Sequence, residues 1–127
     1  MPMTSKILVV DDEPEFCSLF SNVLTEMGYE VSTAVGGWQG LAKIRENPPD
    51  ILFLDIKMSE MDGLECLRRI RKIKRKFAVV VMTGYGDIKS AREAMRLGAD
   101  EFISKPFDLD DLKRLMNELV GELVGDA

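Results

Sequence analysis

The run ILFLD, Ile51 to Asp55, decides the fold of this chain, because four consecutive apolar residues lead directly to a carboxylate. A short unbroken apolar run is typical of a strand that is covered on both faces, as in a parallel sheet. Glu30–Ala34 has the composition of a further strand. Three other segments repeat the form and also end in polar residues: Lys6–Val10 before Asp11 and Asp12, Phe77–Met82 before Thr83, and a short strand centred on Phe102 and Ile103 that ends at Lys105-Pro106.

Amphipathic segments with apolar residues at helical spacing separate these strands. Four of these segments carry residues that are expected to face inward: Phe16, Leu19, Phe20, Val23, Leu24 and Met27 between Pro14 and Gly28; Trp38, Leu41, Ala42 and Ile44 before Pro48-Pro49; Leu64, Leu67 and Ile70 after Gly63; and Leu112, Leu115, Met116, Leu119 and Leu123 in a last helix from about Leu109. A further helix is expected from about Asp87 to Leu97, where Gly98 ends it. Five such strand–helix units predict one domain over residues 1–127, with a parallel sheet and helices on both faces.

The composition excludes several classes of function. Of the 127 residues, 46% are hydrophobic and 31% charged, which is typical of a globular domain, and the net charge of −5 argues against nucleic acid as a direct partner. There is no histidine, which excludes Ser-His-Asp catalysis and histidine-ligated metals. The two cysteines, Cys17 and Cys66, lie inside apolar helical patterns and are expected to be buried thiols. No apolar run is long enough to span a membrane and no signal peptide is visible, so a cytoplasmic location is expected.

The polar residues that end the strands predict a site. In parallel sheets the ligand site lies beyond the carboxyl ends of the strands, which would bring together Asp11, Asp12, Asp55, Thr83 and Lys105. Clustered carboxylates repel one another unless a cation joins them, and Mg²⁺ prefers oxygen ligands. A carboxylate can attack phosphorus to give an aspartyl phosphate, while a lysine ammonium and a threonine hydroxyl can bind phosphoryl oxygens. Taken singly, Asp is often a helix N-cap and Thr an ordinary strand residue, but their joint placement favours a site.

Four segments carry a resemblance to a known family: ILVVDDEP (residues 7–14), ILFLDIKMSEMDGLE (51–65), VVVMTGYGD (79–87) and ADEFISKPF (99–107). In this order they closely resemble the receiver domains of two-component response regulators, over about Lys6 to Leu123. The resemblance implies a flavodoxin-like fold of five strand–helix units with strand order 2-1-3-4-5. It also implies that Asp55 is the phosphoacceptor, that Asp12, Asp55 and the backbone carbonyl of Lys57 bind Mg²⁺ with Asp11 acting through water, and that Thr83 and Lys105 bind the phosphoryl group.

The same resemblance implies how the domain would signal. Phe102 matches the family's switch aromatic, the Lys105-Pro106 bond its cis peptide, and Lys57 and Tyr85 the two positions that set the lifetime of the phosphate. A histidine kinase or a phosphotransfer protein would donate the phosphoryl group. The output would be a changed surface on the last helix–strand–helix face, including Lys89, Arg92 and Met95, for a homodimer or an effector. The expected chemistry is self-directed phosphotransfer and autodephosphorylation, not the turnover of an enzyme.

Other interpretations remain open at this point. The fold class is shared with nucleotide and flavin binders, but the acidic turn Asp11-Asp12-Glu13 would repel phosphate unless a metal were bound. A phosphatase acting through an aspartyl phosphate would need a second acid and a substrate-binding cap. The basic run Arg68–Lys76 is interpreted as the solvated end of a helix in preference to a patch for nucleic acid or an acidic partner, and Trp38 as a packing residue. The segment TGYGDI (83–88) resembles receivers of nitrogen-regulation-type activators and of hybrid kinases, so the chain is expected to be either a stand-alone regulator or part of a longer one.

Overall fold

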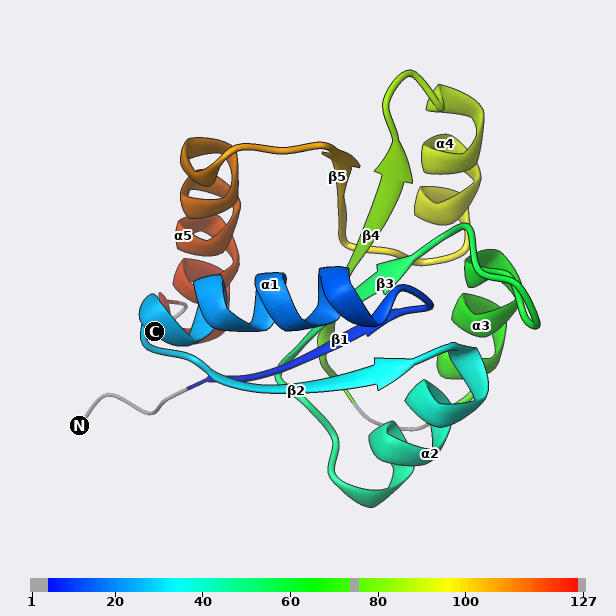
Figure 1. The fold of residues 1–127 in the computed structure, drawn as a ribbon, viewed down its shortest axis with the longest axis horizontal. Helices are drawn as coiled ribbons and strands as arrows, with labels where there is room; N and C mark the ends of the chain where they lie inside the picture. The colour runs from blue at the N-terminus through cyan, green and yellow to red at the C-terminus, as the bar shows by residue number, and fades with distance from the viewer. Residues whose placement is uncertain (1–4, 74–75, 126–127) are drawn as a thin grey trace.

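The computed structural model describes residues 5–73 and 76–125, with side chains described as far as Gly121. Its centre is a sheet of five parallel strands, and their order across the sheet is β2-β1-β3-β4-β5 (Figure 1). The strands are β1 (Lys6–Asp11), β2 (Glu30–Val35), β3 (Ile51–Asp55), β4 (Ala78–Gly84) and β5 (Glu101–Lys105). The predicted parallel sheet and its strand order are therefore confirmed.

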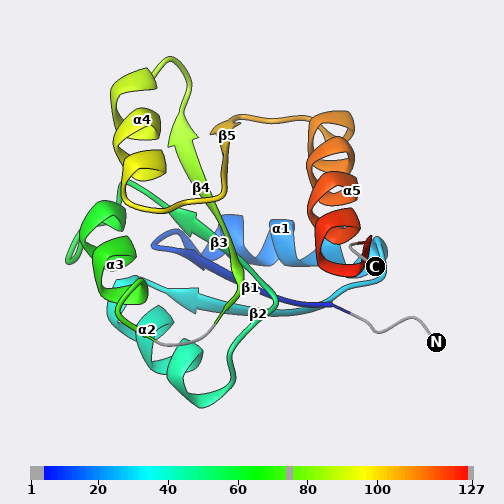
Figure 2. The ribbon, with the colours of Figure 1, turned by 180° about the vertical axis from the view of Figure 1, so that it is seen from behind.

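Five helices cover both faces of this sheet. Helices α1 (Pro14–Glu26) and α5 (Leu109–Gly125) lie on one face, and α2 (Gly37–Glu46), α3 (Gly63–Ile70) and α4 (Ile88–Arg96) lie on the other (Figure 1, Figure 2). Local chemistry sets several of their ends. Pro14 opens α1, and the carboxylates of Asp62 and Asp87 accept hydrogen bonds from the N–H groups of Glu65 and Ser90 at the starts of α3 and α4.

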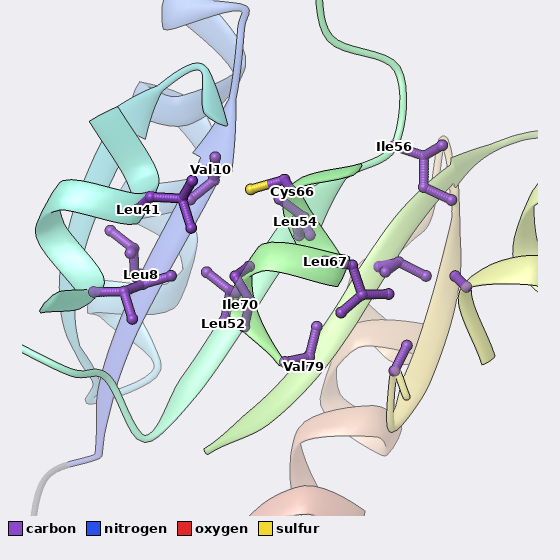
Figure 3. Packing of buried hydrophobic residues seen from close by; sticks show 14 of the residues in the cluster. Leu8, Val10, Leu41, Leu52, Leu54, Ile56, Cys66, Leu67, Ile70 and Val79 are labelled. Atoms are coloured by element: carbon purple, nitrogen blue, oxygen red, sulfur yellow. The ribbon is translucent and has the colours of Figure 1, made fainter. Parts of the chain in front are cut away.

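The sheet separates two hydrophobic cores. Because side chains alternate along a strand, Leu8 and Val10 of β1 face α2 and α3, whereas Ile7 and Val9 face α1 and α5. Figure 3 shows the first core, in which Leu41 of α2 and Leu67 of α3 meet the strand residues. The run Ile51–Leu54 is fully buried, as its unbroken apolar sequence predicted for a central strand. Cys17 and Cys66 are free thiols buried in these cores.

Four residues expected to face inward lie on the surface instead. Leu19 is 67% exposed and Val23 is 36% exposed, because Cys17, Phe20 and Leu24 form the inner stripe of α1. Trp38 is 55% exposed and Ala42 is also exposed, so both predictions were wrong. The reason in α2 is that Gly40 faces the sheet: a Cβ on Gly40 would lie only 2.8 Å from Val10 Cγ2, which shows how closely the helix approaches β1. Leu123, also predicted to be buried, lies outside the residues whose side chains are described.

Strand β2 forms one edge of the sheet, and side chains of α2 contact its outer backbone groups. Gln39 Oε1 accepts a hydrogen bond of 2.8 Å from the N–H of Val35. Lys43 Nζ donates a hydrogen bond to the carbonyl oxygen of Thr33. The helix that follows this edge strand therefore turns back and binds its backbone. Within the described residues, no helix is long and apolar enough to cross a membrane.

Candidate functional site

The polar residues predicted to form a site meet at the carboxyl edge of the sheet. Asp11 is the last residue of β1 and Asp55 the last residue of β3, and Asp12 directly follows Asp11. One carboxylate oxygen from each of the three residues lies within 4.8 Å of the other two. Asp11 is fully buried and Asp55 is 7% exposed. The parallel arrangement of neighbouring strands thus concentrates three acidic groups in a small, poorly solvated space.

A single ammonium group lies against these carboxylates. Lys105 Nζ, at the end of β5, is 2.6 Å from Asp11 Oδ2 and 3.8 Å from Asp55 Oδ1. It also lies 4.0 Å from the centroid of the Phe16 ring, which covers it from α1. Such a cation compensates part of the acidic charge, but one positive charge cannot balance three carboxylates. The site therefore keeps a net negative charge when the three carboxylates are ionised.

The pKa of Asp55 reflects this imbalance. Burial and the neighbouring Asp11 carboxylate raise the pKa of Asp55 from its ordinary value of 3.8 to about 6, and Asp12 adds to the effect. Lys105 and a hydrogen bond from the backbone N–H of Lys57 lower it, but they do not cancel the increase. Ionisation of Asp55 therefore lowers the stability of the folded state.

We expect Asp55→Asn to stabilise the fold at neutral pH in the absence of metal. The folded-state pKa lies above the unfolded value, so folded Asp55 holds its proton more tightly, and stability falls as the pH rises from about 4 to about 6. The difference between 3.8 and about 6 corresponds to roughly 3 kcal/mol of stability, which the native chain loses by pH 7 and the asparagine variant keeps. Urea unfolding in EDTA at pH 5 and pH 7 measures this, with Asp110→Asn on the exposed start of α5 as control. Equal stability of native and Asp55→Asn chains at both pH values would contradict it.

Backbone contacts of two loops fix the acidic groups. Asp12 Oδ2 accepts a hydrogen bond of 3.0 Å from the N–H of Ser59, and Asp11 Oδ1 accepts one of 3.0 Å from the N–H of Glu13. Gly63 lies directly on the end of β3: a Cβ there would be 2.2 Å from the carbonyl oxygen of Asp55. The roles of Ser59 and Gly63 were not predicted from the sequence. A glycine directly after Asp62, the N-cap of α3, could have indicated the close approach of α3 to the end of β3.

Thr83 lies beside the acidic groups on the next strand. Asp55 pairs with Met82 across β3 and β4, so Thr83 lies one residue further toward the site, and its side chain is 2% exposed. Its Oγ1 is 3.4 Å from Ser104 Oγ on β5. Ser104 was not singled out from the sequence, because its contact depends on the register in which β4 pairs with β5. The Lys105-Pro106 peptide bond is cis.

The remaining predicted residues lie at the rim of the site. Phe102 is 45% exposed and lines a cavity of about 300 Å³ together with Thr83, Ile88, Ala91 and Met95. Tyr85 is 87% exposed and shares a hollow with Phe102 and Pro106, so its ring points to solvent in this state. Lys57 is exposed, and its charge contributes to lowering the pKa of Asp87, after the hydrogen bonds from Ser90.

The donor set fits Mg²⁺. Three carboxylates supply oxygen ligands, which this hard cation prefers, and burial together with the neighbouring Asp11 carboxylate raises the pKa of Asp55. Asp11, Asp12 and Asp55 are the side chains that can hold the ion, and Lys57, whose backbone carbonyl was predicted as a further ligand, lies exposed two residues after Asp55. Within the described residues, this is the one cluster of three acidic or thiol side chains with such spacing.

Comparison with known proteins gives a consistent result. The family model "Response regulator receiver domain" matches residues 7–117. The chain is 37% identical over 111 residues to sporulation initiation phosphotransferase F of Bacillus subtilis, and the match covers 87% of this chain and 90% of the relative. The crystal structure of the receiver domain of NtrX from Brucella abortus superposes with a TM-score of 0.83 at 39% identity, covering 90% of this chain and 97% of that one.

Some relatives are much longer than this chain. The transcriptional regulatory protein ZraR of Klebsiella oxytoca is 39% identical over 112 residues, which cover 88% of this chain but 25% of that protein. The chain thus spans about a quarter of the length of the transcriptional regulators that it matches.

Proposed function

Because the chain belongs to the response-regulator receiver domain family of two-component signalling, we propose that it is a switch in which Asp55 accepts a phosphoryl group. The donor would be a histidine kinase or a phosphotransfer protein, as is general for the family. The observation that carries the proposal is the position of the Asp55 carboxylate, buried at the end of β3 between two further carboxylates and 3.8 Å from the ammonium group of Lys105.

The residues of the site have distinct roles in this proposal. An Asp55 carboxylate oxygen attacks phosphorus, a new O–P bond forms, and the bond between phosphorus and the donor's imidazole nitrogen breaks as that nitrogen takes up a proton. Mg²⁺, held by Asp11, Asp12 and Asp55, would supply positive charge for the phosphoryl oxygens. Lys105 would move from Asp11 Oδ2 toward a phosphoryl oxygen, and the Thr83 hydroxyl would donate a hydrogen bond to another.

Movement of Thr83 would change the output surface. The cavity of about 300 Å³ beside Thr83 is lined by apolar groups of α4 and is bordered by the half-exposed ring of Phe102. When Thr83 moves toward the phosphate, the ring of Phe102 would turn inward and α4 would adjust. The surface that changes lies on α4, β5 and α5 and includes the exposed Lys89, Arg92 and Met95. A second copy or an effector would bind there.

This function differs from that of an enzyme that turns over external substrates. The chemistry is confined to Asp55, which gains a phosphoryl group and loses it by hydrolysis. Since longer relatives carry this domain as about a quarter of their length, we propose that the switch controls a transcription effector, with no direct contact between this domain and nucleic acid. We place the switch in the cytoplasm, where response regulators typically work.

Chemical phosphorylation tests the proposed function. Incubation with acetyl phosphate and Mg²⁺ should add one phosphoryl group to the native chain, and EDTA should prevent it, because the acidic cluster needs added positive charge to admit a phosphate. Intact-mass spectrometry measures the product. Absence of a phosphorylated species under conditions that label a known receiver domain would overturn the proposal.

We also expect Mg²⁺ to raise the melting temperature of the chain. Binding to the folded cluster stabilises it by mass action and relieves the repulsion among the three carboxylates, and each kcal/mol gained should raise Tm by about 3–6 °C. Asp12→Ala should lose most of this effect, since it removes one ligand. Differential scanning calorimetry with millimolar Mg²⁺ measures it. An equal increase in Tm for native and Asp12→Ala chains would show that the metal binds elsewhere.

We expect the aspartyl phosphate to be long-lived. Lys57 cannot accept a hydrogen bond from an attacking water, and Tyr85 could close the approach only if its exposed ring moved. Substituting Asn at 57 and Glu at 85 together should speed hydrolysis by about tenfold, a barrier change of about 1.4 kcal/mol. Decay on a phosphate-affinity gel, after removal of the donor, measures it. Decay of the double variant at the native rate would show that these side chains do not protect the phosphate.

A further inference from the structure

An exposed aromatic residue on the far side of the sheet from α1 and α5 has no role in the proposed function. Trp38, the single tryptophan of the chain, is 55% exposed at the start of α2. The guanidinium group of Arg69 on α3 lies 4.9 Å from the centroid of its ring, within the range of a cation–π contact. The two helices lie side by side (Figure 1), so the contact joins their outer surfaces.

Positive charge gathers around this contact. Glu65 pairs with both Arg69, at 3.0 Å, and Arg68, at 3.4 Å, so one carboxylate serves two guanidinium groups. Arg45 on α2 and Lys72 just after α3 are exposed as well, and neither forms an ion pair among the described residues. We call these residues the Trp38–Arg69 face: Trp38, Arg45, Glu65, Arg68, Arg69 and Lys72. It carries four cations and one carboxylate in a chain whose net charge is −5.

The core does not account for this face. Helix α2 is fixed to the sheet by Leu41 and Ile44, and α3 by Cys66, Leu67 and Ile70. Trp38 therefore contributes little to folding, while exposure of its ring to water is unfavourable. Arginine stacking limits the motion of the ring, and tryptophan and arginine are the residues most enriched among those that dominate binding energy at interfaces. These features are typical of a surface prepared for a partner.

We propose that the Trp38–Arg69 face binds an acidic segment of a partner polypeptide that also carries apolar side chains. Carboxylates of the segment would pair with Arg68 and Arg69, whose planar guanidinium groups suit carboxylates, and an apolar side chain would cover the Trp38 ring. Binding would exclude water from groups that are only half solvated in the free chain. None of the residues of this face belongs to the acidic site, so the proposal does not depend on phosphorylation.

Charge also explains why the partner is a peptide segment and not a nucleic acid. Nucleic acid is a long polyanion, and the negative charge of the whole domain would repel it over the Debye length of about 10 Å at 0.1 M salt. A short acidic segment meets only the local positive surface. The position of Glu65 inside the face further disfavours a phosphate backbone, whereas a carboxylate that replaces Glu65 at one arginine leaves it paired with the other.

Trp38 makes a direct test possible, because its emission reports this face alone. The probe is a synthetic fluorescein-labelled peptide that repeats Glu-Glu-Leu. Titration of the native chain should give a saturable rise in peptide anisotropy and a shift of Trp38 emission to shorter wavelength. Removal of both guanidinium groups in Arg68→Ala/Arg69→Ala should weaken binding by about tenfold, and Arg69→Lys should weaken it less, since the charge remains.

The control is Arg96→Ala on α4, which removes a more exposed arginine that also pairs with a glutamate three residues away. It should bind the peptide as the native chain does. Three results would overturn the proposal: no saturable binding, equal binding by the double variant, or tighter binding of a short duplex DNA that also shifts Trp38 emission. A doubling of mass in light scattering without peptide, lost in the double variant, would assign the face to a second copy and would also overturn it.

Discussion

Replacing Asp55 by Asn is expected to abolish phosphorylation of the chain by acetyl phosphate. The substitution keeps the size and shape of the side chain but replaces the nucleophilic oxygen by an amide, which does not attack phosphorus at neutral pH. It also removes one of the three carboxylates that can hold Mg²⁺. Because nucleophile and metal ligand are lost together, the expected effect is a loss of all labelling, whatever the time of incubation.

Intact-mass spectrometry measures this loss, and two further observations make it specific. Asp110→Asn, at the exposed start of α5, should be labelled as fast as the native chain. The Asp55→Asn variant should also melt higher than the native chain in EDTA, so its failure to react cannot come from unfolding. Labelling of Asp55→Asn to the native extent would show that another residue accepts the phosphoryl group.

The second large effect is expected for Gly63→Ala, which should unfold far more readily than the native chain. A Cβ at this position would lie 2.2 Å from the carbonyl oxygen of Asp55 and 2.5 Å from the Cα of Ile56. Both are backbone atoms of the strand end, so neither can rotate away, and α3 would have to move from β3. Overpacking of this kind costs roughly 3 kcal/mol, at the upper end of what small-to-large substitutions show.

Gly121→Ala is the matched control for that substitution. Gly121 is a helical glycine of α5 whose added Cβ would have no neighbour within 4 Å. Alanine there should stabilise the chain by about 0.5–1 kcal/mol, since glycine is unfavourable inside a helix. Urea unfolding of both variants gives the comparison. Equal stability of Gly63→Ala and the native chain would mean that the loop after Asp55 can shift without loss, and that it does not hold the acidic site in place.

The sequence was sufficient for the parallel sheet and for the strand-end residues, because both depend on short-range pattern, whereas the strand order was implied by the resemblance to receiver domains. The apolar run before Asp55 predicted a covered central strand, and parallel topology then placed Asp11, Thr83 and Lys105 at one edge. The contacts of Ser59 and Ser104 could not be predicted in this way. They depend on how a loop folds back and on the register between two strands, and neither leaves a periodic signal in the chain.

The side of a helix that faces the sheet was harder to predict than its existence. In α2, apolar spacing allowed Trp38 to be counted with Leu41 and Ile44, yet the helix turns Gly40 toward the sheet and Gly37 toward Met61 and Cys66. The decisive factor was the close approach of backbone to Val10, which favours small residues over large ones. Hydrophobicity ranks tryptophan as a core residue, whereas the close approach of α2 to Val10 leaves no room for a side chain at Gly40.

The hydrogen bonds from α2 to the outer backbone of β2 bear on how the protein behaves at high concentration. An edge strand with free N–H and carbonyl groups is a template on which a strand from another molecule can pair, the first step toward aggregation. Gln39 and Lys43 occupy two of those groups, Val35 N–H and Thr33 C=O, so an incoming strand would have to displace both side chains. At the opposite edge, β5 is only five residues long, which limits pairing there. Two side chains of α2 at one edge and the short length of β5 at the other therefore disfavour edge-to-edge polymerisation of the domain.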